Sequence, residues 1–257
     1  HTIRNSIFYN PNASEEIGRR ASGAFMNLFY SLTSSEISGC ANSDQYNCEG
    51  MIYGNPIFTD IEIGDYSIQP TSPCIDSGSP NSDLDPDGTI ADMGVYFFNQ
   101  APIYVSPTGS DDNSGTQSSP KATIQAGISA SNFAVKILEG EYSITTNILL
   151  PEGILLELDP GVTLKFDENK TFQNKGEFIA RGTETNPIVF TSNSNSPSAG
   201  DWNFIQFMDE TLDAEFDNDT NYVSGSIMEH CVIEYSKGLE IKKSGPYINK
   251  SIFRYNS

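Results

Sequence analysis

Ser72-Pro-Cys-Ile-Asp-Ser-Gly-Ser-Pro80 and, shortly after it, Leu84-Asp-Pro-Asp-Gly-Thr-Ile-Ala-Asp-Met-Gly-Val-Tyr-Phe97 lie near the middle of the 257-residue chain. Pro, Gly, Asp and Ser are frequent in both stretches, which indicates turns. On either side of them the chain consists largely of short apolar runs separated by polar residues. These two stretches therefore divide the sequence into two regions, and each region needs its own interpretation.

The apolar runs are rich in Ile, Val, Phe and Tyr and are bounded by Gly, Pro, Asn, Asp or Ser, which predicts β-strands separated by turns. A meandering sandwich would join neighbouring strands by dipeptides such as Asn-Gly, and these are nearly absent. A solenoid takes several short strands per coil of roughly 20 or more residues. The sequence favours the solenoid, because Asn249-Lys-Ser-Ile-Phe-Arg-Tyr-Asn256 echoes Asn5-Ser-Ile-Phe-Tyr-Asn10.

Three further stretches carry a resemblance to a known family. They are Ile103-Tyr-Val-Ser-Pro-Thr-Gly-Ser-Asp-Asp-Asn-Ser-Gly-Thr116, Pro151-Glu-Gly-Ile-Leu-Leu-Glu-Leu-Asp-Pro-Gly-Val-Thr-Leu-Lys-Phe166 and Ala180-Arg-Gly-Thr-Glu-Thr-Asn-Pro-Ile-Val-Phe-Thr-Ser192. They resemble the opening and first full coils of secreted bacterial right-handed parallel β-helix proteins of the pectate-lyase-like superfamily. The stretch at 72–97 is similar to the closing segment of the same proteins. The resemblance covers residues 54–98 and 101–257.

A closing segment placed before an opening segment predicts two partial units. We expect residues 1–98 to be the C-terminal coils and closing segment of one β-helix unit, residues 99–102 a linker, and residues 103–257 the N-terminal cap and first coils of a second unit. A helix from about 120 to 130, with Ser119 as its N-cap and Pro120 at its first position, would cover the open backbone groups of the first coil. We then expect the chain to be a window onto a longer array of tandem repeats. One compact protein with native termini and a permuted order of segments is the alternative.

The chain is strongly acidic, with 34 Asp and Glu against 14 Lys and Arg and a formal net charge of -20. Such a surface repels nucleic acid and anionic lipid, and it attracts cations. No apolar run reaches the roughly 20 residues that are needed to cross a bilayer. We therefore expect no nucleic-acid partner and no membrane insertion.

Calcium is the predicted cofactor. The predicted ligands are Asp83, Asp85, Asp87, Asp92, Asp111 and Asp112. The first three stand at every second position, the spacing by which a calcium loop wraps carboxylates around one ion, and the fourth would replace the usual bidentate Glu. The last two precede the predicted helix and form a second candidate loop. Polar turns account for both loops without a metal, and this alternative stays open.

The four cysteines fall into two groups. Cys40 and Cys48 bracket a short polar segment and predict a disulfide, which would stabilise the chain by about 2.5 kcal/mol; two free thiols are the alternative. The resemblance to an exported family favours the disulfide. Cys74 and Cys231 lie in apolar surroundings without a second ligand at metal spacing, so they are predicted to be buried.

The sequence identifies no catalytic residue. The resemblance implies a Lys or Arg base in the lyases of this fold, and glycosidases need two carboxylates about 5 to 10 Å apart. Lys242-Lys243 is the only adjacent basic pair of the second region, and a solvated face explains it. His230 is predicted at the surface. Trp202, Tyr222 and Tyr235 are candidates for carbohydrate contact, because aromatic rings can stack on sugars; packing within the stack is the alternative.

The predicted fold class is all-β, a right-handed parallel β-helix with a short capping helix on the second unit. The predicted function is a non-catalytic, secreted or cell-surface module for extension, adhesion or carbohydrate contact. Its expected partners are a polysaccharide or cell-surface glycan and neighbouring repeat units or head-to-tail copies. The alternative is a polysaccharide lyase or glycoside hydrolase whose catalytic groove lies outside these residues or is poorly marked within them, because this fold supports both kinds of function.

Overall fold

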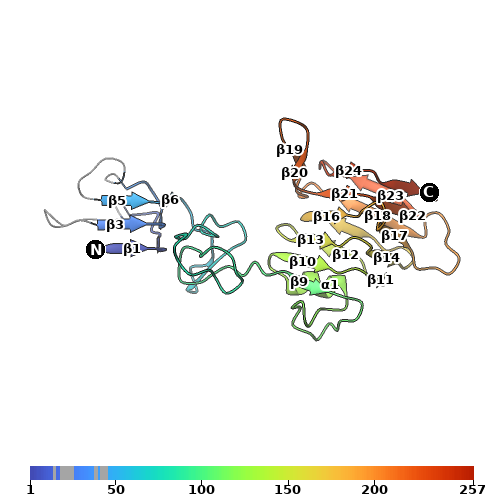
Figure 1. The fold of residues 1–257 in the computed structure, drawn as a ribbon, viewed down its shortest axis with the longest axis horizontal. Helices are drawn as coiled ribbons and strands as arrows, with labels where there is room; N and C mark the ends of the chain where they lie inside the picture. The colour runs from blue at the N-terminus through green and yellow to red at the C-terminus, as the bar shows by residue number, and fades with distance from the viewer. Residues whose placement is uncertain (14–15, 18–25, 38–39, 41–45) are drawn as a thin grey trace. The chain divides into compact units, whose positions relative to one another are not determined.

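The computed structural model describes residues 1–13, 16–17, 26–37, 40 and 46–257. The chain divides into two compact units, His1–Gln100 (unit 1) and Ala101–Ser257 (unit 2) (Figure 1). The division falls inside the segment that the sequence predicts as a linker. The assignment of the two units to partial β-helices of a longer array stays a prediction.

Unit 2 is built from three sheets of parallel strands. Sheet 1 contains β9 (Ile103–Val105), β10 (Ala134–Ile137), β13 (Leu155–Leu158), β16 (Glu177–Arg181), β21 (Ile227–Glu229) and β24 (Tyr247–Asn249). Sheet 2 contains β11 (Glu141–Ile144), β14 (Thr163–Phe166), β17 (Ile188–Ser192), β22 (Cys231–Glu234) and β25 (Ile252–Arg254). Sheet 3 contains β12 (Ile148–Leu150), β15 (Phe172–Asn174), β18 (Trp202–Phe207) and β23 (Ser236–Ile241). The chain passes through the sheets in turn, as successive coils of a solenoid do.

The strands of unit 2 alternate between buried and partly exposed residues, so one face of each sheet forms the core. Parallel register places equivalent side chains over one another from coil to coil. In sheet 2 the buried side chains of Tyr142, Leu164, Phe190 and Ile233 follow one another in register. Apolar and aromatic side chains therefore form a continuous column along the stack.

The helix of unit 2 is shorter than the sequence predicts. Helix α1 spans Ile124–Ala130, and its N-cap is Thr123, whose hydroxyl accepts the Ala126 N–H. The prediction of Ser119 as N-cap was wrong, because Ser119 and Lys121 form bridges with other extended residues. The helix packs against β9 and β10 through buried Ile124 and Ile128. Among the described residues, no helix is long and apolar enough to span a membrane.

Unit 1 has shorter strands than unit 2. One parallel sheet contains β1 (Thr2–Arg4), β3 (Met26–Phe29) and β5 (Tyr46–Glu49), and a second contains β2 (Ile7–Phe8), β4 (Leu32–Thr33) and β6 (Ile52–Tyr53). An antiparallel hairpin follows, made of β7 (Phe58–Asp60) and β8 (Asp65–Ile68). The closing segment, residues 69–100, contains turns and no strand.

The two units share one kind of corner. Asn5 and Tyr30 in unit 1, and Lys250 in unit 2, have positive φ angles near +50°, and a serine follows each of them. These serines, Ser6, Ser31 and Ser251, each donate a hydrogen bond to the carbonyl oxygen two residues earlier. The sequence echo between the two ends of the chain thus corresponds to the same local geometry.

Candidate functional site

Asp92 lies within the closing segment of unit 1 and is only 6% exposed. Its Oδ1 accepts the Asp76 N–H at 2.7 Å, and its Oδ2 accepts the Phe98 N–H at 2.6 Å. Burial raises the pKa of Asp92, although the two N–H groups oppose the rise, and the nearby charge of Asp85 adds to it. The Asp92 carboxylate therefore closes the loop 93–97.

Asp87 and Asp85 also bind backbone N–H groups. Oδ1 of Asp87 accepts the N–H and the hydroxyl of Thr89, and its Oδ2 accepts the Gln100 N–H at 2.7 Å. Partial burial alone would raise the pKa of Asp87, but these hydrogen bonds lower it below its usual value. Oδ2 of Asp85 accepts the Asp92 N–H at 2.9 Å, and burial raises the pKa of Asp85. These carboxylates stabilise turns of the closing segment.

The arrangement does not match the predicted calcium loop. Asp83 is exposed, and both oxygens of Asp87 and Asp92 are directed at protein donors. Within the described ranges, no group of three or more His, Cys, Asp or Glu side chains is placed to hold a metal ion. Two buried oxygens of the same segment, Asp76 Oδ1 and Gln100 Oε1, find no hydrogen-bond partner among the described residues. Calcium binding stays a prediction.

Asp111 holds the entry to helix α1. Its Oδ1 accepts the N–H groups of Ala122 and Thr123 at 2.9 and 2.8 Å, and its Oδ2 accepts the Thr123 hydroxyl. Slight burial would raise the pKa of Asp111, but these hydrogen bonds and the charge of Lys121 lower it. Asp112 is exposed. The Asp111 carboxylate thus caps the residues that lead into helix α1. Calcium binding by this loop also stays a prediction.

Trp202 is a core residue, and its prediction as a carbohydrate contact was wrong. The side chain is fully buried, and its ring stacks on Phe166 at a centroid distance of 4.2 Å. The indole N–H donates to the Glu234 carbonyl oxygen at 2.9 Å. A strand that begins with an aromatic residue on the inner face of the stack buries that residue, and a sugar cannot reach it.

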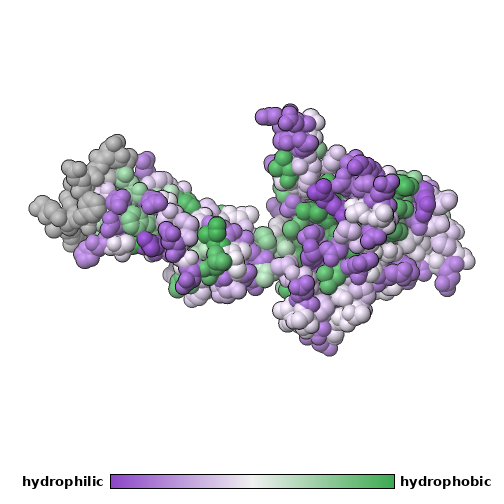
Figure 2. Space-filling view, viewed as in Figure 1, coloured by the Kyte–Doolittle hydropathy of each residue, from purple (hydrophilic) through white to green (hydrophobic). Residues whose placement is uncertain are grey.

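Tyr222 begins the second strand of a hairpin that leaves the stack. The hairpin consists of β19 (Glu215–Phe216) and β20 (Tyr222–Ser224), and it projects from the rest of unit 2 with a hydrophilic tip (Figures 1 and 2). The Tyr222 ring stacks on Tyr247 at 6.1 Å, and the Arg181 guanidinium lies 5.6 Å from its centre. These contacts attach the hairpin to sheet 1 and occupy much of the ring.

Tyr235 lies at a coil corner with a φ of +61°. Its ring stacks on Tyr255 of the next coil at 5.4 Å with an interplanar angle of 13°. Tyr255 is 62% exposed, and Arg254 lies over its ring. Of this pair, Tyr255 is therefore the ring that is more open to a ligand. Carbohydrate contact by Tyr222 or Tyr235 stays a prediction.

A set of ion pairs on the outer face of unit 2 was missed from the sequence. The pairs are Lys136–Glu157, Lys136–Asp159, Lys165–Glu141, Lys175–Glu210, Arg181–Glu229, Lys242–Glu240, Lys243–Asp209 and Arg254–Glu234. Most of them join residues that are at least 20 positions apart. The register between coils decides these pairs, and the sequence pattern does not reveal it.

A groove of about 510 Å³ brings together polar groups at one corner of unit 2. Its lining includes Thr183, Glu184, His230 and Lys250. His230 is partly exposed and has a φ of +50°. A hydroxyl, a carboxylate, an imidazole and an ammonium group therefore line one depression, and these are the groups that acid–base chemistry uses.

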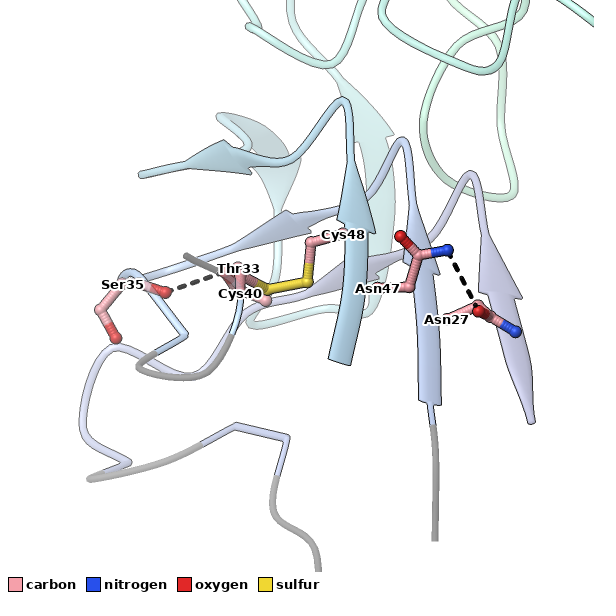
Figure 3. Close-up of a disulfide and its surroundings, with 6 residues drawn as sticks. All are labelled: Asn27, Thr33, Ser35, Cys40, Asn47 and Cys48. Atoms are coloured by element: carbon pink, nitrogen blue, oxygen red, sulfur yellow. Dashed lines mark hydrogen bonds between the residues drawn. A yellow bond between two sulfur atoms is a disulfide. The ribbon is translucent and has the colours of Figure 1, made fainter. Parts of the chain in front are cut away.

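A disulfide joins Cys40 to Cys48 in unit 1, with a Cα–Cα distance of 5.3 Å (Figure 3). Beside it, Asn47 donates to Oδ1 of Asn27 across the parallel sheet, as Figure 3 also shows. Cys74 and Cys231 are free and buried. Burial raises the pKa of Cys74 to about 11 and that of Cys231 to about 12, so both thiols stay protonated at neutral pH.

Part of the chain matches a known family of β-helix domains. Residues 129–211 match the family model of the pectate-lyase like beta helix domain. This match supports the superfamily that the sequence motifs indicate, and it covers strands β10 to β18 of unit 2. Export and a bacterial source stay predictions.

Among curated proteins, the chain is similar to Protein bark beetle of Drosophila melanogaster, with 34% identity over 110 residues. This stretch is 43% of the present chain and 4% of that protein. The chain therefore spans a very small part of its curated relative. No solved structure matches the chain.

Proposed function

We propose that the chain is a non-catalytic, right-handed β-helix module of an exported or cell-surface protein, and that it serves extension, adhesion or carbohydrate contact. The parallel, in-register strands of unit 2 and the family match at residues 129–211 support the β-helix. A rigid stack of coils is suited to extending a chain and to presenting a long, regular surface. Neighbouring repeat units and surface glycans are the proposed partners.

The non-catalytic assignment rests on the ion pairs that the basic side chains form. In unit 2, many Lys and Arg side chains form ion pairs with carboxylates, most of which lie on a neighbouring coil. Arg181 binds Glu229 at 3.1 Å, and Arg254 binds Glu234 at 2.7 Å. These cations act as links between coils along the outer face.

Ion pairing opposes the chemistry that the lyases of this fold need. A basic side chain that abstracts a proton needs a lowered pKa. Partial burial would lower the pKa of Lys136, but the hydrogen bond and charge of Glu157, together with Asp159, raise it. The hydrogen bond that Arg254 donates to Glu234 likewise raises the pKa of Arg254. Such groups stabilise the stack and are poor bases.

The groove beside His230 favours the second candidate function, which is a polysaccharide lyase or hydrolase. Its volume of about 510 Å³ lies in the range of ligand sites, and it contains Glu184 and Lys250 besides the imidazole. We rank this function second because the groove offers one carboxylate, whereas glycosidases of the usual mechanism need two.

Incubation of the whole chain with polygalacturonate and with neutral polysaccharides tests the proposal. Ultraviolet absorbance follows the unsaturated products of a lyase, and a reducing-end assay follows hydrolysis. We expect both signals to stay at the level of the substrate alone. Product formation that is lost in His230→Ala or Lys250→Met, and retained in the surface control Lys242→Met, would replace the proposed module by an enzyme.

A further inference from the structure

Unit 1 contains a cavity of about 460 Å³ that none of the predicted site residues lines. Three segments of unit 1 surround it. They are the first coil of this unit, which carries β1 and β2, the hairpin β7–β8 and the loop 93–97. Its lining includes Asn5, Phe58, Tyr66, Ile68, Val95 and Tyr96. The volume lies within the range of about 300–1,000 Å³ that is typical of small-molecule sites.

Two tyrosine rings of the lining are open to solvent. Tyr66 is 51% exposed and Tyr96 is 54% exposed. Neither hydroxyl makes a hydrogen bond to a described residue, so both can donate to a ligand and accept from it. Phe58 packs edge-on against Tyr66 at 5.5 Å and an interplanar angle of 85°, and Tyr9 packs edge-on against Phe58. One of the two open rings is therefore held in place by its neighbours.

The loop that carries Tyr96 is fixed at both ends. At its start, Met93 is fully buried and its N–H donates to the Cys74 carbonyl oxygen. The Gly94 N–H donates to the Asn5 carbonyl oxygen at 3.0 Å. After it, the Phe98 N–H is held by the Asp92 carboxylate. The exposed residues of the loop thus stand on a rigid base, which reduces the ordering cost of binding.

Gly94 allows the loop 93–97 to pass close to Ile7 in the first coil of unit 1. Its φ is +118°, a conformation that side-chain-bearing residues rarely adopt, and a Cβ there would lie 3.0 Å from Cδ1 of Ile7. The close passage places the loop and the first coil on the two sides of the cavity. The cavity is therefore a consequence of backbone geometry as well as of side chains.

The charge of the lining selects the ligand. None of the ten lining residues is an Asp, Glu, Lys, Arg or His, although the whole chain carries a formal charge of -20. A uronate or phosphate group would find no cation in this cavity to balance it, and the acidic surroundings would repel it. A neutral ligand has neither penalty. Open aromatic rings with polar edges suit a neutral ligand that has both apolar faces and hydroxyl groups.

We propose that this cavity binds a neutral sugar unit of a glycan, which stacks on the rings of Tyr66 and Tyr96. The hydroxyls of these two tyrosines meet the sugar hydroxyls. The side chains of Asn5 and Ser6, which also line the cavity, are already hydrogen-bonded within unit 1. The inference deepens the proposed carbohydrate contact and rests on it. It places that contact in unit 1, away from Tyr222 and Tyr235.

Isothermal titration of the full chain with neutral gluco-, xylo-, manno- and galacto-oligosaccharides, and with oligogalacturonate as the acidic counterpart, tests the inference. We expect at least one neutral oligosaccharide to bind and oligogalacturonate not to bind. Tyr66→Ala and Tyr96→Ala should each weaken binding about tenfold. The matched control Tyr53→Ala, an exposed tyrosine of unit 1 outside the lining of the cavity, should leave the affinity unchanged.

Two further variants retain the aromatic ring, and a spectroscopic check excludes unfolding as the cause of lost binding. Tyr66→Phe and Tyr96→Phe retain the aromatic face and should lose less affinity than the alanine variants, while circular dichroism checks that all variants are folded. Binding that survives in the Tyr66→Ala/Tyr96→Ala double variant would overturn this site and leave carbohydrate contact elsewhere intact. Preference for oligogalacturonate, or no binding of any neutral sugar, would also overturn it. The product assay described above tests the non-catalytic assignment separately.

Discussion

Units 1 and 2 form the same kind of corner but stabilise it by different means. In unit 2, sheets of four to six parallel strands enclose one cluster that includes the buried rings of Phe166, Phe172, Phe178, Phe190 and Trp202. In unit 1, the parallel sheets have three strands each, and the closing segment contains no strand. Carboxylate-to-backbone hydrogen bonds and a disulfide support unit 1. A coil can thus be held by apolar stacking or by polar and covalent links.

The difference between the units has a practical consequence. Apolar stacking responds to the removal of side-chain volume, and it depends little on pH or reducing agents. Polar and covalent links respond to protonation and reduction. We therefore expect variants and conditions that destabilise one unit to leave the other nearly unchanged, because each unit is compact by itself.

The largest expected effect is on unit 2. Trp202→Ala removes a fully buried ring together with its stacking on Phe166, and a substitution of this kind costs about 3–5 kcal/mol. For a unit of this size, the melting temperature should fall by roughly 10 °C. Differential scanning calorimetry should show the shift in the transition of unit 2 alone. Equal shifts in both units would contradict their independence, and Trp202→Phe should have a smaller effect.

The second effect belongs to unit 1. Loss of the Cys40–Cys48 bond in the Cys40→Ser/Cys48→Ser variant should destabilise unit 1 by about 2.5 kcal/mol, because the bond restricts the unfolded chain. The melting temperature of unit 1 should fall by roughly 10 °C or more. A reducing agent should have the same effect on the unsubstituted chain and none on unit 2. An unchanged transition would show that the disulfide contributes nothing to the fold.

The third effect is specific to Asp92. Asp92→Asn keeps the shape of the side chain but leaves one oxygen to accept where two accepted before, so one of the N–H groups of Asp76 and Phe98 loses its partner. A lost buried hydrogen bond of this kind costs about 1–3 kcal/mol. Chemical denaturation of the two chains at neutral pH measures the difference. Asp83→Asn, at an exposed carboxylate of the same segment, is the matched control.

The stability of unit 1 depends on pH through two opposite contributions. The pKa values of Asp85 and Asp92 are raised by burial, so the folded state binds protons more tightly there and these groups favour folding as the pH falls toward their pKa values. The pKa of Asp87 is lowered, so its contribution is present above its unfolded pKa and is lost at still lower pH. Stability should therefore rise slightly on mild acidification and then fall. In Asp92→Asn the rise should be smaller.

Much of unit 2 was predictable from its sequence because strand periodicity and Pro-Gly turns are local signals. Parallel strands with alternating burial occur at 155–158 and 163–166, as the apolar runs predict. The start of helix α1 was misplaced because Ser119 and Pro120 have the local form of a cap, while β-bridges of Ser119 with Thr116 and of Lys121 with Val105 hold this stretch extended. Trp202 was misplaced because the sequence does not show which face of a strand points inward.

The sites were less predictable than the fold. The alternate Asp residues at 83–87 have the spacing of calcium ligands, but the same spacing serves the capping of turns, and only hydrogen-bond partners distinguish the two uses. The cavity beside Tyr66 and Tyr96 brings together residues that are 30 positions apart in the sequence. Long-range register decides such contacts, and a single sequence does not reveal it.

Calcium provides a further way to separate the units. Burial raises the pKa values of Asp85 and Asp92, and the charge of Asp76 adds to both shifts, so a cation near these two carboxyl groups would relieve repulsion in unit 1. At ten times its dissociation constant, calcium would stabilise the folded unit by about 1.4 kcal/mol. We expect a calcium-dependent rise in the melting temperature of unit 1 that Asp85→Asn/Asp87→Asn removes. An identical rise in that variant would exclude this loop as the site.

The smallest expected effect concerns the ion pairs of unit 2. Arg254 and Glu234 are joined at 2.7 Å, and their side chains are 51% and 12% exposed. Solvent screens such a pair, so a double-mutant cycle with Arg254→Met and Glu234→Gln should give only a weak coupling, smaller than any of the effects above. The coupling should decrease in high salt. A coupling of several kcal/mol would mean that the outer face of unit 2 is stabilised by charge as strongly as its core is by packing, and the contrast between the two units would then be much weaker.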